Sequence, residues 1–103
     1  MITSHHWTDN GTPMGGSTYG NGFAISWQNG PLVDADGERK SPNGAFVEDI
    51  IKAAIDRIEY YQASKYVSQY NATALDHLRS AVEWLNARTK DREYRGVEGT
   101  KQV

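Results

Sequence analysis

Two stretches of apolar residues at helical spacing constrain what this chain can fold into. In the first, apolar side chains recur every three or four positions from Val47 to Tyr61, and in the second they recur from Leu75 to Leu85. This spacing places them along one stripe of a helix. A break precedes Asn71, so the two predicted helices form an αα-hairpin joined by a short turn.

The helix ends are predicted from capping residues. The stripes indicate helices over about 44–66 and about 72–94. Ser41 or Asn43 suits the cap of the first helix and Asn71 that of the second, because short polar side chains accept hydrogen bonds from the first free N–H groups.

Composition limits the core that these helices can build. The chain has 103 residues, of which 38% are hydrophobic, so it is one domain at most with a thin core. Two helices do not cover both stripes fully, and Trp84 lies off the centre of the second stripe. We therefore expect the chain to self-associate.

A short strand is predicted before the hairpin, in residues 22–32 (GFAISWQNGPL). Phe23, Ile25 and Trp27 alternate with smaller residues, as in a half-buried strand, before an Asn-Gly turn signal. One strand needs a partner, which is the N-terminal arm, residues 32–40 or another chain. Trp27 is suited either to core packing or to stacking on a flat base.

These elements predict an α+β fold, with a small N-terminal antiparallel β element followed by a long helical hairpin that oligomerises. Residues 1–21, rich in Gly, Ser, Thr and Asn, are expected to form a flexible or partner-ordered arm. The rest, 22–103, is expected to be a single domain with a β element at 22–40, a hairpin at 43–95 and a C-terminal turn at 96–103.

Several classes of function are disfavoured. The net charge of −2 argues against binding to long nucleic acid, and the absence of cysteine excludes thiol chemistry. Neither a transmembrane run nor a signal peptide is evident, so we expect no membrane partner and a cytosolic protein.

The adjacent His5 and His6 chelate poorly, so no metal or cofactor is expected. No credible catalytic set occurs, because Asp49, Asp56 and Glu59 occupy surface-like helical positions.

The strongest chemical signal is a row of arginines near the C-terminus. Arg88, Arg92 and Arg95 are spaced by four and three residues, and Gly96 and Gly99 follow. Guanidinium groups on one helix face suit phosphate oxygens, and glycines let backbone N–H groups approach an anion. The alternative is a solvated helix end, where cations offset the helix dipole and glycine terminates the helix.

Three blocks in order resemble a known family. The blocks are GFAISWQNGPL, then NGAFVEDIIKAAIDRIEYYQASKY with NATALDHL, then VEWLNARTKDREYRGVEGT. Together they resemble the phage-encoded Thoeris anti-defence sponges and the shorter anti-CBASS sponges. The resemblance implies a non-enzymatic hexamer in the host bacterial cytoplasm that sequesters cyclic nucleotide immune signals. The signal is a cyclic ADP-ribose isomer in Thoeris and a cyclic di- or trinucleotide in CBASS.

The resemblance also implies roles for individual residues. Tyr61 matches an aromatic position that stacks on adenine, and Asn71 matches a polar contact at the hairpin turn. Arg88 and Arg92 match arginines that hold a diphosphate, while Trp27 remains a candidate platform for a base. The terminal turn matches an element that surrounds cyclic trinucleotides at a symmetry axis, and its residues are Arg95, Gly96, Glu98, Gly99 and Thr100.

The chain departs from the family pattern in one place. A Gly-Arg pair often follows the Gly-Pro-Leu turn, but Val33 follows Leu32 here. Loss of that arginine is expected to weaken binding of the ADP-ribose isomer unless Arg39 or Lys40 replaces it. The alternative function is an oligomeric phage structural or assembly protein that binds no small molecule.

Overall fold

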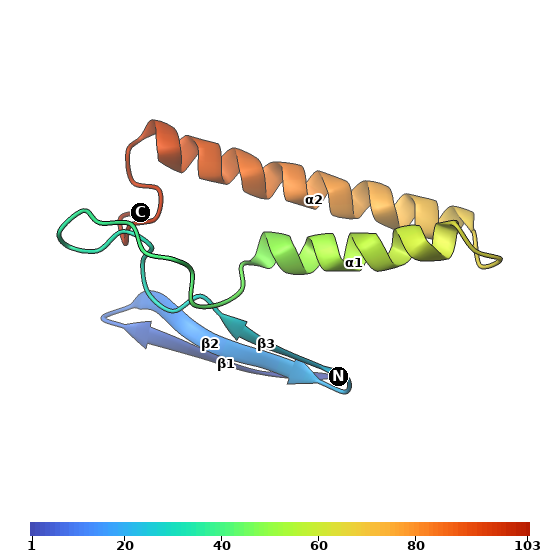
Figure 1. The fold of residues 1–103 in the computed structure, drawn as a ribbon, viewed down its shortest axis with the longest axis horizontal. Helices are drawn as coiled ribbons and strands as arrows, with labels where there is room; N and C mark the ends of the chain where they lie inside the picture. The colour runs from blue at the N-terminus through green and yellow to red at the C-terminus, as the bar shows by residue number, and fades with distance from the viewer. The chain divides into compact units, whose positions relative to one another are not determined.

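Three antiparallel strands begin the chain in the computed structural model, which describes residues 1–103. They are β1 (Ile2–Asp9), β2 (Thr12–Gly20) and β3 (Phe23–Trp27), in the sheet order β1-β2-β3 (Figure 1). The strand that the alternation predicted is therefore confirmed, and its partner is β2.

Residues 1–21 differ from the flexible or partner-ordered arm expected from the sequence, because they fold back on themselves as β1 and β2. Asn10 and Gly11 connect the two strands with φ values of 50° and 78°. Positive φ at both central residues is the geometry of a tight hairpin turn whose twist matches that of the flanking strands.

Two glycines on β2 permit close approach of neighbouring strands, one to an aromatic ring of β3 and one to the backbone of β1. Gly16 pairs with Trp27 and Gly20 pairs with Phe23. A Cβ atom added at Gly20 would lie 2.6 Å from the Phe23 ring, and one at Gly16 would meet the carbonyl oxygen of His5. These strand glycines therefore serve close packing within the sheet.

The segment before the first helix runs alongside β3. The Ala45 N–H donates to the Ser26 carbonyl oxygen at 2.7 Å, and the Gln28 N–H donates to the Ala45 carbonyl oxygen at 3.1 Å. A Cβ atom at Gly44 would lie only 2.5 Å from the Trp27 carbonyl carbon. These contacts hold residues 44–46 extended, so the helix begins later than the predicted Gly44.

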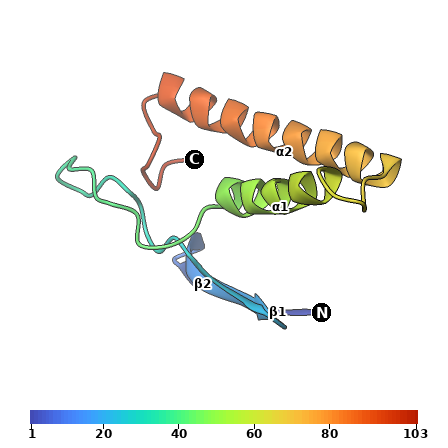
Figure 2. The ribbon, with the colours of Figure 1, turned by 45° about the vertical axis from the view of Figure 1, so that its right-hand side comes forward.

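The hairpin consists of α1 (Val47–Gln62) and α2 (Gln69–Tyr94), which lie side by side in both ribbon views (Figures 1 and 2). Ser68 caps α2, because its Oγ accepts a hydrogen bond from the Asn71 N–H at 3.1 Å. The predicted cap, Asn71, is instead in the first turn of α2. Asn43 does not cap α1 either, because its side chain bonds to the backbone of Asn29.

The hairpin has little buried core. Leu75 is its one buried residue, with 4% of its surface exposed, and α1 has none. The other stripe residues are half-buried, for example Ile55 and Val82. Trp84 is 76% exposed, as its position off the stripe predicted. Neither α1 nor α2 combines the length and apolar character needed to cross a bilayer.

The chain after α2 returns to the loop at residues 32–40. Gly96 follows the helix with φ at 75°, which is typical of a glycine helix stop. The Val33 N–H then donates to the Gly99 carbonyl oxygen at 2.8 Å. Two compact units make up the structure: the sheet unit (Met1–Phe46 with Arg95–Val103) and the hairpin unit (Val47–Tyr94).

Candidate functional site

An arginine and two tyrosines cluster near the end of α1. The Tyr60 and Tyr61 ring centroids are 6.0 Å apart, and the Arg57 guanidinium lies 4.9 Å from the first and 5.0 Å from the second. Arg57 Nε also donates to the Tyr61 hydroxyl at 3.2 Å, which raises the pKa of Arg57 above its ordinary value. We call these residues the Arg57–Tyr61 cluster, which joins a cation to the exposed ring of Tyr60 and the half-buried ring of Tyr61.

Arg57 is a residue that the sequence patterns above did not single out. Arg57 precedes the tyrosines by three and four residues, which is the spacing at which side chains meet on one helix face. That spacing was the signal available in the sequence.

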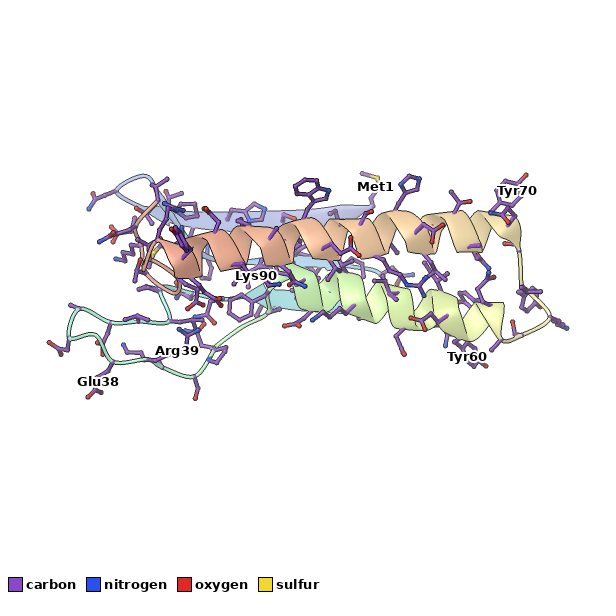
Figure 3. The ribbon with its side chains drawn as sticks, turned by 90° about the horizontal axis from the view of Figure 1, so that it is seen from above. Met1, Glu38, Arg39, Tyr60, Tyr70 and Lys90 are labelled. Carbon is purple, nitrogen blue, oxygen red and sulfur yellow. The ribbon has the colours of Figure 1, made fainter.

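Asn71 lies at the same end of the hairpin and holds the connecting loop. Its Nδ2 donates to the Tyr66 carbonyl oxygen at 3.1 Å. Figure 3 shows Tyr60 on α1 and Tyr70 on α2 at this end, and both are exposed. The loop end of the hairpin therefore presents aromatic surface around a polar, hydrogen-bonded turn.

Arg88 and Arg92 lie on the far part of α2. Arg88 Nη2 is 3.7 Å from Glu48 Oε1 at the start of α1. About five helical turns separate Asn71 from Arg88, which is roughly 25 Å at the usual rise of an α-helix. One hairpin therefore does not bring both arginines and Tyr61 around a small ligand.

Trp27 belongs to the sheet unit and is half-buried. Its indole N–H donates to Thr18 Oγ1 at 2.8 Å, and Thr18 Oγ1 lies 3.0 Å from Ser4 Oγ. Thr18 is itself buried. These contacts fix Trp27 against β2, and its role as a platform for a base stays a prediction.

The C-terminal turn engages its own polar groups. Glu98 accepts two hydrogen bonds from Arg39, Nη1 to Oε2 at 2.7 Å and Nη2 to Oε1 at 2.9 Å. Thr100 Oγ1 donates to the Val97 carbonyl oxygen at 2.6 Å. The carboxylate and hydroxyl assigned to a cyclic trinucleotide are thus bonded within the chain.

Arg95 and the two glycines of this turn take different positions. Arg95 follows the end of α2, and its Nη1 donates to the Val103 carbonyl oxygen at 2.9 Å. A Cβ atom added at Gly96 would have no neighbouring atom within 4 Å. One added at Gly99 would lie 3.1 Å from Val33 Cγ2. Gly99 therefore serves close packing of the turn on the loop.

Comparison with known proteins assigns the family. Residues 21–90 match the model described as "Acb2/Tad1, hairpin domain". The chain belongs to the Acb2/Tad1 hairpin family. It is also 40% identical, over 78 residues, to a protein named Thoeris anti-defense 1 from Bacillus phage SBSphiJ7. That alignment covers 76% of this chain and 51% of the relative, so the chain spans about half the length of that protein.

The Acb2/Tad1 match covers some candidate residues and not others. Trp27, Tyr61, Asn71 and Arg88 lie within it. Arg92 and the C-terminal turn lie after its last matched residue. β1 lies before its first matched residue. Within the matched part, the Arg57–Tyr61 cluster is the arrangement best suited to a planar ring.

Proposed function

We propose that this protein is a phage anti-defence protein that binds and sequesters cyclic nucleotide immune signals in the host cytoplasm. The observation that carries the proposal is its 40% identity to the Thoeris anti-defense 1 protein, together with its family membership. The first ligand is a cyclic ADP-ribose isomer, and cyclic di- or trinucleotides form a second class. The protein acts by binding alone, without altering the ligand.

The Arg57–Tyr61 cluster supplies the base-binding surface in this proposal. The exposed Tyr60 ring and the half-buried Tyr61 ring offer π surface to adenine, and the Arg57 guanidinium already lies against both rings. Arg88 and Arg92 hold the diphosphate, because forked donors suit phosphate oxygens. Asn71 adds a polar contact beside the ring.

Self-association completes this arrangement. Tyr61 and Arg88 are far apart in one hairpin, so a neighbouring antiparallel copy has to supply the arginines to each aromatic cluster. The half-exposed stripes and Trp84 provide apolar surface for such an interface. Repetition of this contact in a closed hexamer gives several sites per particle.

A cyclic trinucleotide requires a different arrangement at the C-terminal turn. The ligand has to compete with Arg39 for Glu98, or else contact the backbone of Gly96, Gly99 and Thr100 instead. This competition predicts weaker binding of the trinucleotide than a turn with an unpaired acid would give.

Isothermal titration with a cyclic ADP-ribose isomer tests the proposal. We expect binding by the natural chain and loss of about tenfold or more in affinity for both Tyr61→Ala and Arg92→Ala. Lys52→Gln, an exposed change on α1, is the matched control. A second titration with a cyclic trinucleotide uses Gly99→Trp as the variant that blocks the turn.

Absence of binding to every cyclic nucleotide tested would leave the structural or assembly role instead. Sequestration without chemistry is checked by denaturing the complex and identifying the released nucleotide by mass spectrometry. Recovery of a hydrolysed product would contradict the non-enzymatic part of the proposal.

A further inference from the structure

The N-terminal strand β1 is an open edge of the sheet. In the order β1-β2-β3 it has a neighbour on one side only, and all eight of its residues are exposed. An antiparallel strand bonds to its neighbour through alternate residues, so about half of the backbone N–H and C=O groups of β1 point away from β2. Unpaired groups of this kind are a template for a further strand.

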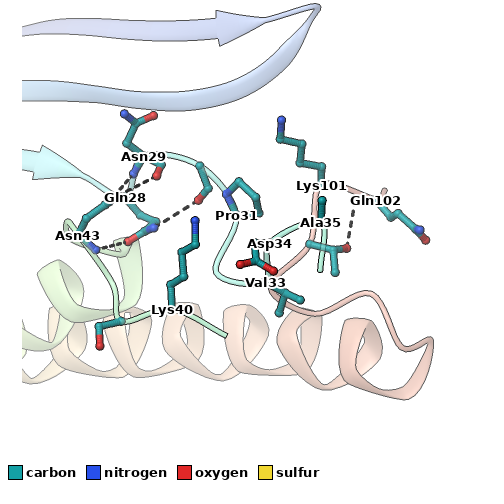
Figure 4. A pocket seen from close by; sticks show the side chains of 13 residues that line it. Gln28, Asn29, Pro31, Val33, Asp34, Ala35, Lys40, Asn43, Lys101 and Gln102 are labelled. Carbon is teal, nitrogen blue, oxygen red and sulfur yellow. Dashed lines mark hydrogen bonds between the residues drawn. The ribbon is translucent and has the colours of Figure 1, made fainter. Parts of the chain in front are cut away.

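The opposite edge of the sheet is partly covered by the chain itself. The segment before α1 bonds to the end of β3 through Ala45, as described above. Side-chain amides hold this segment, because the Asn29 N–H donates to Asn43 Oδ1 at 2.8 Å and the Asn43 N–H donates to Gln28 Oε1 at 2.8 Å (Figure 4). Residues 23–25 remain open on β3, so the long open edge belongs to β1.

β1 lacks the features that usually protect a free edge. Its sequence, ITSHHWTD, has no proline, lysine or arginine, and Ile, Thr and Trp favour strands. The irregularity in the pairing of β1 with β2 does not interrupt β1 either. His6 pairs with Gly16, and the next pair, Thr8 with Pro13, lies two residues further along β1 but three residues further along β2. The extra residue is therefore on β2, and β1 runs unbroken over its whole length.

The side chains of β1 alternate between the two faces of the sheet. Ser4 lies on the same face as the buried Thr18, because their hydroxyl oxygens are 3.0 Å apart. His5, Trp7 and Asp9 therefore lie on the other face. Trp7 is 56% exposed. This face thus presents an imidazole, an indole and a carboxylate in a row along the open edge.

We propose that β1 pairs with β1 of a second copy, antiparallel about a twofold axis at Trp7, so that the two sheets become one. In this register Trp7 lies opposite Trp7 of the second copy, and His5 lies opposite Asp9 twice. An imidazole donates to a carboxylate in either protonation state, and opposed aromatic rings add cross-strand stability. Because the contact uses the long open edge of both chains, the pairing closes as a dimer.

Complementarity selects this register over one with more paired residues. An antiparallel pairing that used all eight residues of β1 would place His5 opposite His6 and Ile2 opposite Asp9. It would set two basic side chains against each other and an apolar side chain against a charge. The register at Trp7 avoids both contacts and still pairs residues 5–9, about the length of an average strand.

This contact is separate from self-association through the hairpin. β1 precedes the first residue that the Acb2/Tad1 model matches, and none of its residues belongs to the hairpin unit. The inference therefore goes beyond the proposed function and does not depend on a cyclic nucleotide. Tyr61→Ala is expected to leave the β1 contact unchanged.

Oxidative crosslinking of the full chain tests the register. The chain has no cysteine, so a single introduced thiol reports one contact. Trp7→Cys places the two substituted residues directly opposite each other, with Cα atoms about 4.5–5.5 Å apart, which is within disulfide range. We expect most of this variant to become a covalent dimer under mild oxidation. The control is Ser26→Cys, at an exposed position of β3 on the face of His5, and it should remain uncrosslinked.

Sedimentation equilibrium tests the same contact without a thiol. His5→Asp sets two carboxylates opposite each other at two places and should weaken the β1 contact about tenfold. Combining His5→Asp with Asp9→Lys restores opposite charges and should recover the affinity, whereas Lys52→Gln on α1 should have no effect. Circular dichroism checks that each variant keeps its fold.

The outcomes separate a second copy from other occupants of this edge. If Trp7→Cys formed no covalent dimer, or no more than Ser26→Cys forms, the edge would be left for a strand of a different protein and the inference would be overturned. Failure of the double variant to recover the affinity lost in His5→Asp would overturn the register at Trp7.

Discussion

Different interactions stabilise the sheet unit and the hairpin unit. In the sheet unit, side-chain hydrogen bonds link Trp27, Thr18 and Ser4, and glycines permit close backbone approach. In the hairpin unit, two helices meet along apolar stripes, but Leu75 is the one residue that they bury. The sheet unit is thus rich in specific polar contacts, and the hairpin unit is poor in buried apolar surface.

This difference indicates where each unit gains its stability. Hydrogen-bonded and closely packed groups define one geometry within a single chain. Half-exposed stripes leave apolar area that association can still remove from water. We therefore expect substitutions in the sheet unit to act within the chain, and those in the hairpin unit to act also through self-association.

The largest expected effect is that of Leu75→Ala. Removing this buried side chain leaves a cavity between α1 and α2 and should lower the free energy of unfolding by about 2–5 kcal/mol. Urea unfolding followed by circular dichroism measures it, at a fixed protein concentration because association contributes. Tyr70→Ala, at a residue 89% exposed, is the control. If both changes lowered the free energy of unfolding equally, Leu75 would not be the buried residue that holds the two helices together.

A comparison of two glycines sharpens the description of the sheet unit. Gly96 and Gly99 have φ values of 75° and 78°, so alanine at either costs about 1–2 kcal/mol in backbone strain. At Gly99 the added Cβ also lies 3.1 Å from Val33 Cγ2 and 3.3 Å from Arg39 Nη1. We expect Gly99→Ala to cost about 1 kcal/mol more than Gly96→Ala in urea unfolding.

Equal unfolding free energies for the two variants would mean that the turn does not pack on the loop as described.

Much of the fold was predictable where the signal is local. The stripes predicted both helices and the alternation of Phe23, Ile25 and Trp27 predicted β3, because periodicity reports one buried face. The first hairpin also had a local signal, the Asn10-Gly11 turn, which composition obscured. The start of α1 had none, because it depends on the pairing of Ala45 with Ser26.

In the candidate site, too, local contacts were predictable from the sequence and long-range contacts were not. The contact of Arg57 with Tyr61 follows from a spacing of four and was readable from the sequence. The contact of Arg39 with Glu98 spans 59 positions and depends on the return of the chain after α2. A pattern search does not find such a pair, so the engagement of Glu98 emerged only from the structure.

A smaller effect is expected at the start of α2. Ser68 Oγ accepts the Asn71 N–H, and the Ser68 N–H donates to Gln62 Oε1 at 3.0 Å. Ser68→Ala removes the first bond and should destabilise the chain by about 1 kcal/mol. Ser80→Ala, at an exposed position within α2, should be neutral or slightly stabilising. If Ser80→Ala lowered the free energy of unfolding as much as Ser68→Ala, this result would argue against Ser68 as the cap of α2.

The smallest effect is expected for Glu98→Gln, although its contact with Arg39 is the most regular ion pair in the chain. The Arg39 side chain is 56% exposed, so water and salt screen the pair and its loss should cost no more than about 1 kcal/mol. Hydrogen exchange should nevertheless increase at the N–H groups of Val33 and Lys40, because both depend on the clamped loop. Glu83→Gln on α2 is the control. Faster exchange along α2 in Glu98→Gln would mean that this contact stabilises the hairpin as well, and that the two units are not independent.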